Sequence, residues 1–347
     1  MRKEDELIGL LSLGPVDQEW LDKVTTILRE SLDWDYIIAI AGLEGVSSLI
    51  YDRLKKNRLE RFIPELILIR FESIYYTYSA QNALFYEELS LVASALDKGG
   101  IPVIMLKGVF LAAGIYENIA LRPMRDLDLL VKKEDVVSSV GILEKLGYQP
   151  IVAVKEQWEN PFNYSLTLAK ANVGINNSVT VDLHWHILNA SWLMGLSSRK
   201  CDMKHIWESA EIAVIGGIRT RVLSAEYLLI SLAINAFTHC YERLILLADF
   251  EEVLKQYKTK VDWNLVYGKA KTCYLENILF YTLEFVSRTP LSGARPGKVF
   301  KRKYHYSRPV LMYFFTKRGL IEKSKAFFRI ILVITRFLFK RLEHKKT

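Results

Sequence analysis

The chain has 347 residues, half of them hydrophobic, with 18 glycines and 9 prolines, a composition that excludes a disordered or fibrous protein. Its net charge of +8 comes from the C-terminal end, where residues 295–347 hold 16 Lys and Arg against two acidic residues. Because the rest of the chain is net acidic, the charge argues against a nucleic-acid groove in the folded core.

The three cysteines, Cys201, Cys240 and Cys273, stand far apart and form no CxxC pair. This spacing predicts neither a disulfide framework nor a zinc site, and it fits a reducing compartment. The N-terminal residues MRKEDE lack the apolar stretch of a secretory signal. We therefore expect a cytoplasmic protein.

Helical spacing of apolar residues predicts an N-terminal helical region over residues 1–99. Its last part, residues 67–96, is expected to form one or two long helices that end at Gly99-Gly100. A mixed α and β core follows over residues 100–190. Its expected strands are 101–106, 126–131, 148–154, 164–169 and 178–187, and its expected helices are 109–116 and 133–146.

The helical period returns over residues 191–290, with helices expected at 223–254, capped by Ser224, and at 263–286. Residues 291–347 read as a basic linker and an amphipathic tail whose apolar part is too short and too interrupted to span a bilayer. The element order predicts an α+β fold in which N- and C-terminal helical segments flank a small mixed β-sheet.

Two carboxylates open the predicted strand 126–131. Side chains alternate along a strand, so Asp126 and Asp128 point to one face while the leucines between and after them point into a core. Carboxylates held together repel each other, and a hard divalent cation with oxygen ligands is the simplest way to neutralise them. The pair therefore indicates a metal site, with Mg²⁺ as the expected ion.

A third carboxylate stands on a later predicted strand. The same alternation puts Asp182, His184 and His186 on one face of the strand 178–187. Three carboxylates on neighbouring strands can hold two metal ions roughly 3.5 to 4 Å apart, an arrangement that stabilises the attacking and leaving oxygens of a phosphoryl displacement.

These motifs stand in a recognisable order: Leu106-Lys107-Gly108, Arg122, Asp126-Leu127-Asp128-Leu129-Leu130-Val131, Gly147-Tyr148 and Asp182-Leu183-His184-Trp185-His186. Together they resemble a bacterial and archaeal nucleotidyltransferase family of the DNA polymerase β-like superfamily. The resemblance implies a polymerase β-like core, in which Asp126 and Asp128 bind metal and Asp182 completes the site and activates an acceptor hydroxyl.

The turn before the first carboxylates departs from the superfamily pattern. Val109 follows Gly108 where Gly or Ser is usual, and Gly108 stands 18 positions before Asp126. We still expect the Gly108 backbone and Lys107 to hold phosphate oxygens, with Arg122 or Arg125 clamping the same phosphates.

Several of these residues have plainer interpretations. Asp126 and Asp128 could form solvated ion pairs with Arg122 and Arg125. His184 and His186 are expected to be structural or substrate-orienting, because imidazole is a poor partner for Mg²⁺. His239, Arg243 and Asp249 share helical turns, where a contact to the acceptor and a polar network between helices fit equally well.

The sequence therefore favours a Mg²⁺-dependent nucleotidyltransferase with two metal ions. It would move an NMP group from an NTP, ATP being the expected one, to a hydroxyl of a small molecule, peptide or protein, with release of pyrophosphate. The acceptor would bind between the core and residues 191–290, with His184, His186 and His239 orienting it. No sequence-specific nucleic acid is expected as a partner.

Two alternatives stay open for the activity: a DxD-type glycosyltransferase that uses a nucleotide-sugar, and a non-catalytic regulator that binds nucleotide. For the tail, residues 324–347 read either as a helix packed on the body or as a surface for anionic lipid or an acidic partner, which would make the protein peripheral at the membrane.

Overall fold

The computed structural model describes residues 2–155, 163–171, 178–188, 201–239 and 241–288. The described residues between Arg2 and Val299 belong to one compact unit, and the division into regions at 1–99, 100–190 and 191–290 stays a prediction. The expected linker and tail at 291–347, and Cys240, lie outside the described residues.

The chain begins with helices, as the sequence predicts. They are α1 (Lys3–Ser12), α2 (Gln18–Leu28), α3 (Trp34–Glu44), α4 (Ser47–Lys56), the 3-10 turn η1 (Glu60–Phe62) and α5 (Glu65–Lys98). Asp17 and Asp33 cap α2 and α3 by accepting hydrogen bonds from backbone N–H groups in the first turns. The 34-residue α5 is a single helix, and it stops before Gly100, whose φ of 71° suits glycine.

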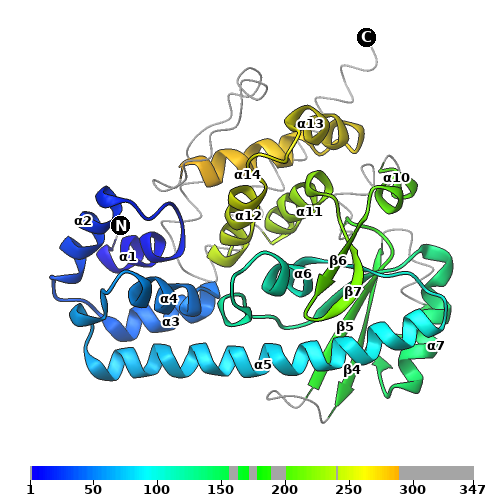
Figure 1. The fold of residues 1–347 in the computed structure, drawn as a ribbon, viewed down its shortest axis with the longest axis horizontal. Helices are drawn as coiled ribbons and strands as arrows, with labels where there is room; N and C mark the ends of the chain where they lie inside the picture. Colours follow the sequence, from blue (N-terminus) through cyan, green and yellow to red (C-terminus); the bar gives the residue numbers. More distant parts are fainter. Residues whose placement is uncertain (1, 156–162, 172–177, 189–200, 240, 289–347) are drawn as a thin grey trace. The chain divides into compact units, whose positions relative to one another are not determined.

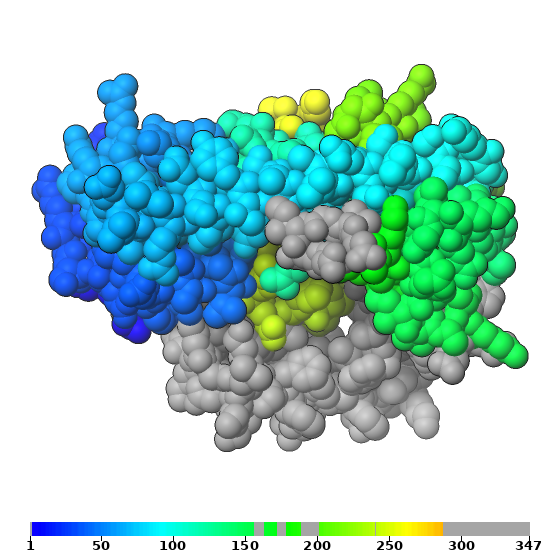
Figure 2. Space-filling model, turned by 90° about the horizontal axis from the view of Figure 1, so that it is seen from below, coloured from blue at the N-terminus to red at the C-terminus, as the bar shows by residue number. Residues whose placement is uncertain are grey.

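Helix α5 connects the N-terminal helices to the sheet. It runs along the surface, where Figure 2 shows it exposed on one side, and its far end packs near α7 (Val136–Lys145). Its buried side carries Asn82, Tyr86 and Glu88, polar residues that reach into the core. The helix therefore supplies polar side chains to the segments around the sheet.

The core is a seven-stranded mixed sheet with the order β3-β4-β5-β2-β1-β7-β6. Its strands are β1 (Ile104–Met105), β2 (Leu127–Leu130), β3 (Gln149–Pro150), β4 (Ser165–Ala171), β5 (Ser178–His184), β6 (Glu211–Ile215) and β7 (Ile218–Val222). Strand β2 runs parallel to β5 and β1 runs parallel to β7, while the other neighbours are antiparallel. The expected α+β fold with a mixed sheet and flanking helices is confirmed.

One part of the sheet contradicts the sequence interpretation, which placed only helices in residues 191–290. Strands β6 and β7 form a hairpin there, turning through Gly216 and Gly217 with φ values of 55° and 82°. Both φ values lie in the region that favours glycine, as tight hairpin turns require. The hairpin joins the sheet because β7 pairs with β1, a contact between distant parts of the chain.

The other helices cover the sheet and build the C-terminal part. They are α6 (Lys107–Gly114), η2 (Ile119–Leu121), η3 (Lys133–Asp135), α7, α10 (Met203–Glu208), α11 (Ala225–Thr238), α12 (Leu244–Tyr257), α13 (Trp263–Thr272) and α14 (Glu276–Arg288). Helix α11 is buried along most of its length and packs against α12, α13 and α14 (Figure 1).

Ser224 precedes α11, but its hydroxyl donates to Glu226 instead of capping the helix. In the part of the chain described, no helix combines the length and the apolar character that a membrane span needs.

A disulfide corrects the expectation from cysteine spacing. Cys201, before α10, and Cys273, at the end of α13, are bonded to each other with their Cα atoms 4.7 Å apart. The two residues are 72 positions apart in the sequence. The spacing of the cysteines did not predict this disulfide, because tertiary folding brings the two residues together and no local motif marks the pair.

Candidate functional site

The register of two parallel strands brings acidic residues side by side. Asp128 of β2 is the pairing partner of Asp182 of β5, and Leu130 is the partner of His184. Paired positions point to the same face of a sheet, so Asp128, Asp182 and His184 gather on one face. The predicted face-sharing of Asp182 and His184 is thus present.

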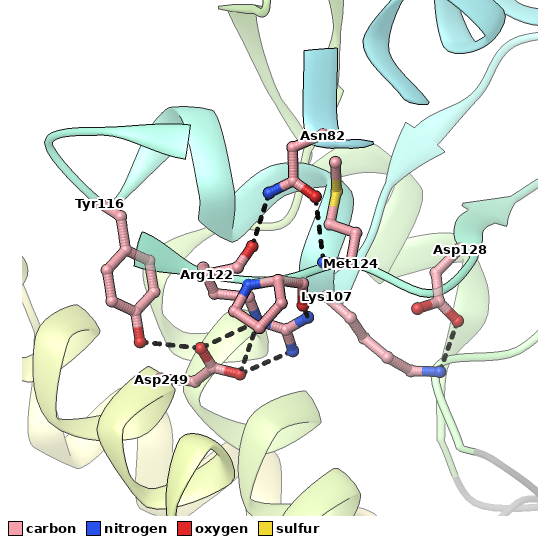
Figure 3. A network of polar contacts seen from close by, with 8 residues as sticks. Asn82, Lys107, Tyr116, Arg122, Met124, Asp128 and Asp249 are labelled. Carbon is pink, nitrogen blue, oxygen red and sulfur yellow. Dashed lines mark hydrogen bonds and ion pairs between the residues drawn. The ribbon is translucent and has the colours of Figure 1, made fainter. Parts of the chain in front are cut away.

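Two basic side chains contact the buried carboxylate of Asp128, which is 3% exposed. The Lys107 ammonium donates to Asp128 Oδ1 at 2.6 Å, and His184 Nε2 lies 2.8 Å from the same oxygen (Figure 3 shows the lysine contact). Burial alone would raise the pKa of Asp128, but Lys107 and His184 outweigh it and hold this pKa well below its usual range. Asp128 is therefore an anion at neutral pH.

Lys107 owes its position to the short strand β1. It follows β1 at the first position of α6, and β1 pairs with β2, so its side chain starts beside Asp128. Its φ of 40° lies in the left-handed region, where a residue other than glycine is strained by about 1–3 kcal/mol. The fold thus holds a strained lysine against the acidic face.

Asp182 is half-buried and receives a hydrogen bond from the neighbouring strand. The hydroxyl of Thr167, on β4, donates to Asp182 Oδ1 at 2.6 Å and so fixes one carboxylate oxygen. Sequence reasoning missed Thr167, although it stands on the strand expected at 164–169.

Asp128, Asp182 and His184 form a set of donors that fits a metal ion. One ligand atom from each lies within 4.8 Å of the other two. Two carboxylates and an imidazole are a common donor set for divalent cations. The acidic cluster expected from the sequence is therefore compatible with metal binding, and it includes a histidine that was not expected to be a ligand.

Asp126 stands just before β2 and outside this set of three donors, although it was predicted as a ligand. Its pKa is raised to about 7 because burial and repulsion by Asp128 and Asp182 outweigh the attraction of Lys107 and Arg122. Asp126 is thus electrostatically part of the cluster. Its role as a metal ligand stays a prediction.

Arg122 forms a buried ion pair that the sequence did not indicate. Its guanidinium donates from Nη2 to Asp249 Oδ2 at 2.8 Å and from Nε to both carboxylate oxygens, while Tyr116 donates to Oδ1 at 2.9 Å (Figure 3). A side chain at Gly108 would place its Cβ 2.7 Å from Arg122 Nη1, so glycine permits this packing. The ion-pair partner of Arg122 is therefore Asp249, on α12. The plainer interpretation had paired Arg122 with Asp126 and Asp128.

Asn82, on α5, fixes the segment that leads into β2. Its amide nitrogen donates to the carbonyls of Ile119 and Arg122 at 2.6 and 2.8 Å, and its amide oxygen accepts from the Met124 N–H at 3.2 Å. Figure 3 shows the contacts with Arg122 and Met124. The residue is fully buried. The sequence signal that could have identified it is an amide side chain at a position that the helical period places on the buried side of α5.

Two of the three histidines predicted to orient the substrate, His186 and His239, lie outside the donor set that includes His184. His186 is buried, accepts the Leu188 N–H through Nδ1 at 3.0 Å and lies against the Tyr164 ring, which is a structural environment. His239 ends α11 and is exposed. Neighbouring protein atoms that partly desolvate the ring, and the positive charge of Lys107, lower the pKa of His239.

The connection between α11 and α12 carries a further cation, Arg243. Burial and repulsion by Arg125 and Arg122 lower the pKa of Arg243, whose Nε donates to the Leu43 carbonyl at 3.3 Å. Arg125 is exposed, immediately before Asp126. Among the described residues, neither arginine has an ion-pair partner, and Asp249 is engaged with Arg122 instead of with Arg243 and His239.

Comparison with known proteins gives distant structural similarities. A solution structure of the antibiotic-resistance factor ANT(2'')-Ia is 12% identical with a TM-score of 0.36, covering 60% of this chain and 95% of that one. A crystal structure of ANT(2'')-Ia in complex with adenylyl-2''-tobramycin is 14% identical with a TM-score of 0.37, covering 55% and 96%. An antigenic nucleotidyltransferase-like protein from Paracoccidioides brasiliensis is 12% identical with a TM-score of 0.35, covering 58% and 93%.

No curated protein matches the sequence. A family model described as an uncharacterised nucleotidyltransferase matches residues 30–289, a span that takes in the sheet, the acidic cluster and the α11–α12 connection. The match covers most of the chain, and the protein is therefore a member of this nucleotidyltransferase family.

Proposed function

We propose that the protein is a Mg²⁺-dependent nucleotidyltransferase that moves an NMP group from an NTP, with ATP as the expected donor, to an acceptor hydroxyl. The observation that carries the proposal is the pairing of Asp128 with Asp182 across two parallel strands, in a chain that belongs to a nucleotidyltransferase family. The products are the nucleotidylated acceptor and pyrophosphate.

The acidic cluster has two tasks in this reaction. Asp128 and Asp182, with Asp126 beside them, would hold divalent metal, which neutralises phosphate charge when bound. Asp182 is also the proton acceptor, because it is half-buried and Thr167 fixes only one of its oxygens. The acceptor oxygen then bonds to the α-phosphorus, its proton passes to Asp182, and the bond between the α-phosphorus and the bridging oxygen of pyrophosphate breaks.

The triphosphate would be bound by the cations around this cluster. Lys107 and the Gly108 N–H stand at the start of α6, and the guanidinium of Arg125 is exposed. We place Arg243 in the same role, since it repels Arg125 and lacks an ion-pair partner in the described part of the chain. Arg122 acts indirectly, because its bonds to Asp249 hold it beside Gly108.

The test is transfer of an α-phosphate label. Purified protein is incubated with α-labelled ATP, GTP, CTP or UTP, Mg²⁺ and host extract as the source of acceptor, and labelled acceptor and pyrophosphate are measured. The α-label separates this reaction from glycosyl transfer, in which the sugar moves. We expect transfer by the wild type and a loss of at least about 100-fold in Asp182→Asn, which keeps the shape of the side chain but cannot accept the proton.

Glu144→Gln is the matched control, since Glu144 is an exposed carboxylate on α7. It should transfer label at the wild-type rate. The proposal fails if no nucleotide supports transfer, or if Asp182→Asn and wild type transfer label equally. Nucleotide binding without pyrophosphate release would favour a regulator.

A further inference from the structure

His184 belongs to the donor set although it is a nitrogen ligand in a site expected to bind Mg²⁺. Its Nε2 lies 2.8 Å from Asp128 Oδ1, and the three donor atoms of Asp128, Asp182 and His184 are within 4.8 Å of one another. The imidazole is 2% exposed and ends strand β5, so the strand pairing that aligns the two aspartates also holds the ring in place.

The same position already accommodates a positive charge. The Lys107 ammonium lies 2.6 Å from Asp128 Oδ1 and 3.5 Å from His184 Nε2, so a cation can approach the carboxylate and the imidazole together. Asp182, the third donor, is reached from the same face. The arrangement is thus open to a metal that accepts both oxygen and nitrogen ligands.

Divalent ions differ in their preference for a site that offers both oxygen and nitrogen ligands. Mg²⁺ prefers oxygen ligands and keeps several waters, so a buried imidazole contributes little to its binding. Ions of the first transition row accept imidazole more readily, and Mn²⁺ among them also suits carboxylates. A site with two carboxylates and one imidazole therefore discriminates between Mg²⁺ and Mn²⁺.

We propose that His184 is a metal ligand and that it makes this site prefer Mn²⁺ to Mg²⁺. The inference rests on the metal site of the proposed function and adds its selectivity. If His184 only oriented Asp128 by a hydrogen bond, its loss would weaken the binding of both ions to the same extent. The ratio of the two affinities therefore separates a ligand from a positioning residue.

The experiment measures metal binding to the full-length, metal-free protein. Free Mn²⁺ is followed by electron paramagnetic resonance, and Mg²⁺ affinity is obtained by competition. Loss of a residue that only supports a ligand already costs about 10- to 100-fold in metal affinity. For loss of a ligand in His184→Gln, we therefore expect Mn²⁺ affinity to fall by at least about 10-fold and Mg²⁺ affinity by less than about threefold. The control is His205→Gln, because His205 is exposed on α10 and lies outside the donor set.

A second measurement detects the nitrogen ligand directly. Pulsed electron paramagnetic resonance of Mn²⁺ bound to the wild type should show coupling to an imidazole nitrogen, which persists in His205→Gln and disappears in His184→Gln. Absence of nitrogen coupling in the wild type overturns the inference, as does an equal loss of both affinities in His184→Gln. If the wild type bound neither ion, the metal site of the proposed function would itself fail, which is a different result.

Discussion

Replacing Asp249 by alanine should strongly destabilise the protein. Asp249 is fully buried and accepts hydrogen bonds from Arg122 and Tyr116, and the Arg122 side chain is only 12% exposed. Burial disfavours the charged form of Arg122, but Asp249 outweighs this effect and raises the pKa of Arg122. A guanidinium stays protonated in proteins, so Arg122 keeps its charge when Asp249 is removed. The variant would therefore bury an uncompensated cation.

Removing one partner of a buried ion pair costs about 3–5 kcal/mol. Each kcal/mol lowers the melting temperature of a domain of 150–250 residues by about 2–4 °C, so we expect a decrease on the order of 10 °C. Thermal unfolding followed by circular dichroism measures it, and urea unfolding gives the free energy. The control is Glu117→Ala, which removes an exposed ion pair with Lys56 and should cost about 0.2–1 kcal/mol.

A double variant separates the lost pair from the lost packing. Arg122→Met with Asp249→Leu replaces both charges by apolar side chains of similar length, and such replacements are often neutral. The double variant should recover most of the stability lost in Asp249→Ala. The reasoning is refuted if Asp249→Ala unfolds within 1 °C of the wild type, or if the double variant is no more stable than the single one.

Two further predictions concern the turn and the acidic cluster. Gly108→Ala should destabilise by about 1–3 kcal/mol, because its Cβ would meet Arg122 Nη1 at 2.7 Å, whereas Gly141→Ala, with open space inside α7, should stabilise by about 0.5–1 kcal/mol in the same unfolding assay. The pKa of Asp126 is about 7 in the folded protein and about 3.9 in the unfolded chain, so the folded state binds the proton of the Asp126 carboxyl more tightly. Protonated Asp126 therefore stabilises the folded state at low pH, and this contribution is lost as the pH rises from about 4 to about 7. With chelator present, Asp126→Asn should therefore melt at a higher temperature than wild type at pH 8, and a gap that did not close toward pH 4 would contradict this reasoning.

Local patterns were enough to predict the acidic face. The alternation in Asp182-Leu183-His184 put the aspartate and the histidine on one side, and the strand register confirms it. Alternation also grouped Asp126 with Asp128, but β2 begins at Leu127, so Asp126 stands outside the regular strand. A sequence pattern gives the face of a residue and leaves the end of its strand uncertain by a residue or two.

What the sequence did not reveal depends on contacts between distant segments. Arg122 stood near the acidic motif and suggested a phosphate ligand, whereas its partner Asp249 lies on a helix more than a hundred residues later. The β6–β7 hairpin was missed because the helical period before and after it dominated, although Gly216-Gly217 between two alternating stretches is a hairpin signal. Pairing of β7 with β1 has no local signature at all.

That pairing has a consequence for synthesis of the chain on the ribosome. One edge of β1 pairs with β2, which follows it by a few tens of residues in the sequence. The other edge pairs with β7, and Arg221, the partner of Ile104, is synthesised roughly 120 residues later. At about 5–20 residues per second, this edge stays open for on the order of ten seconds. An apolar strand with one free edge can pair with another chain, so the nascent protein should be most vulnerable to aggregation between these two events.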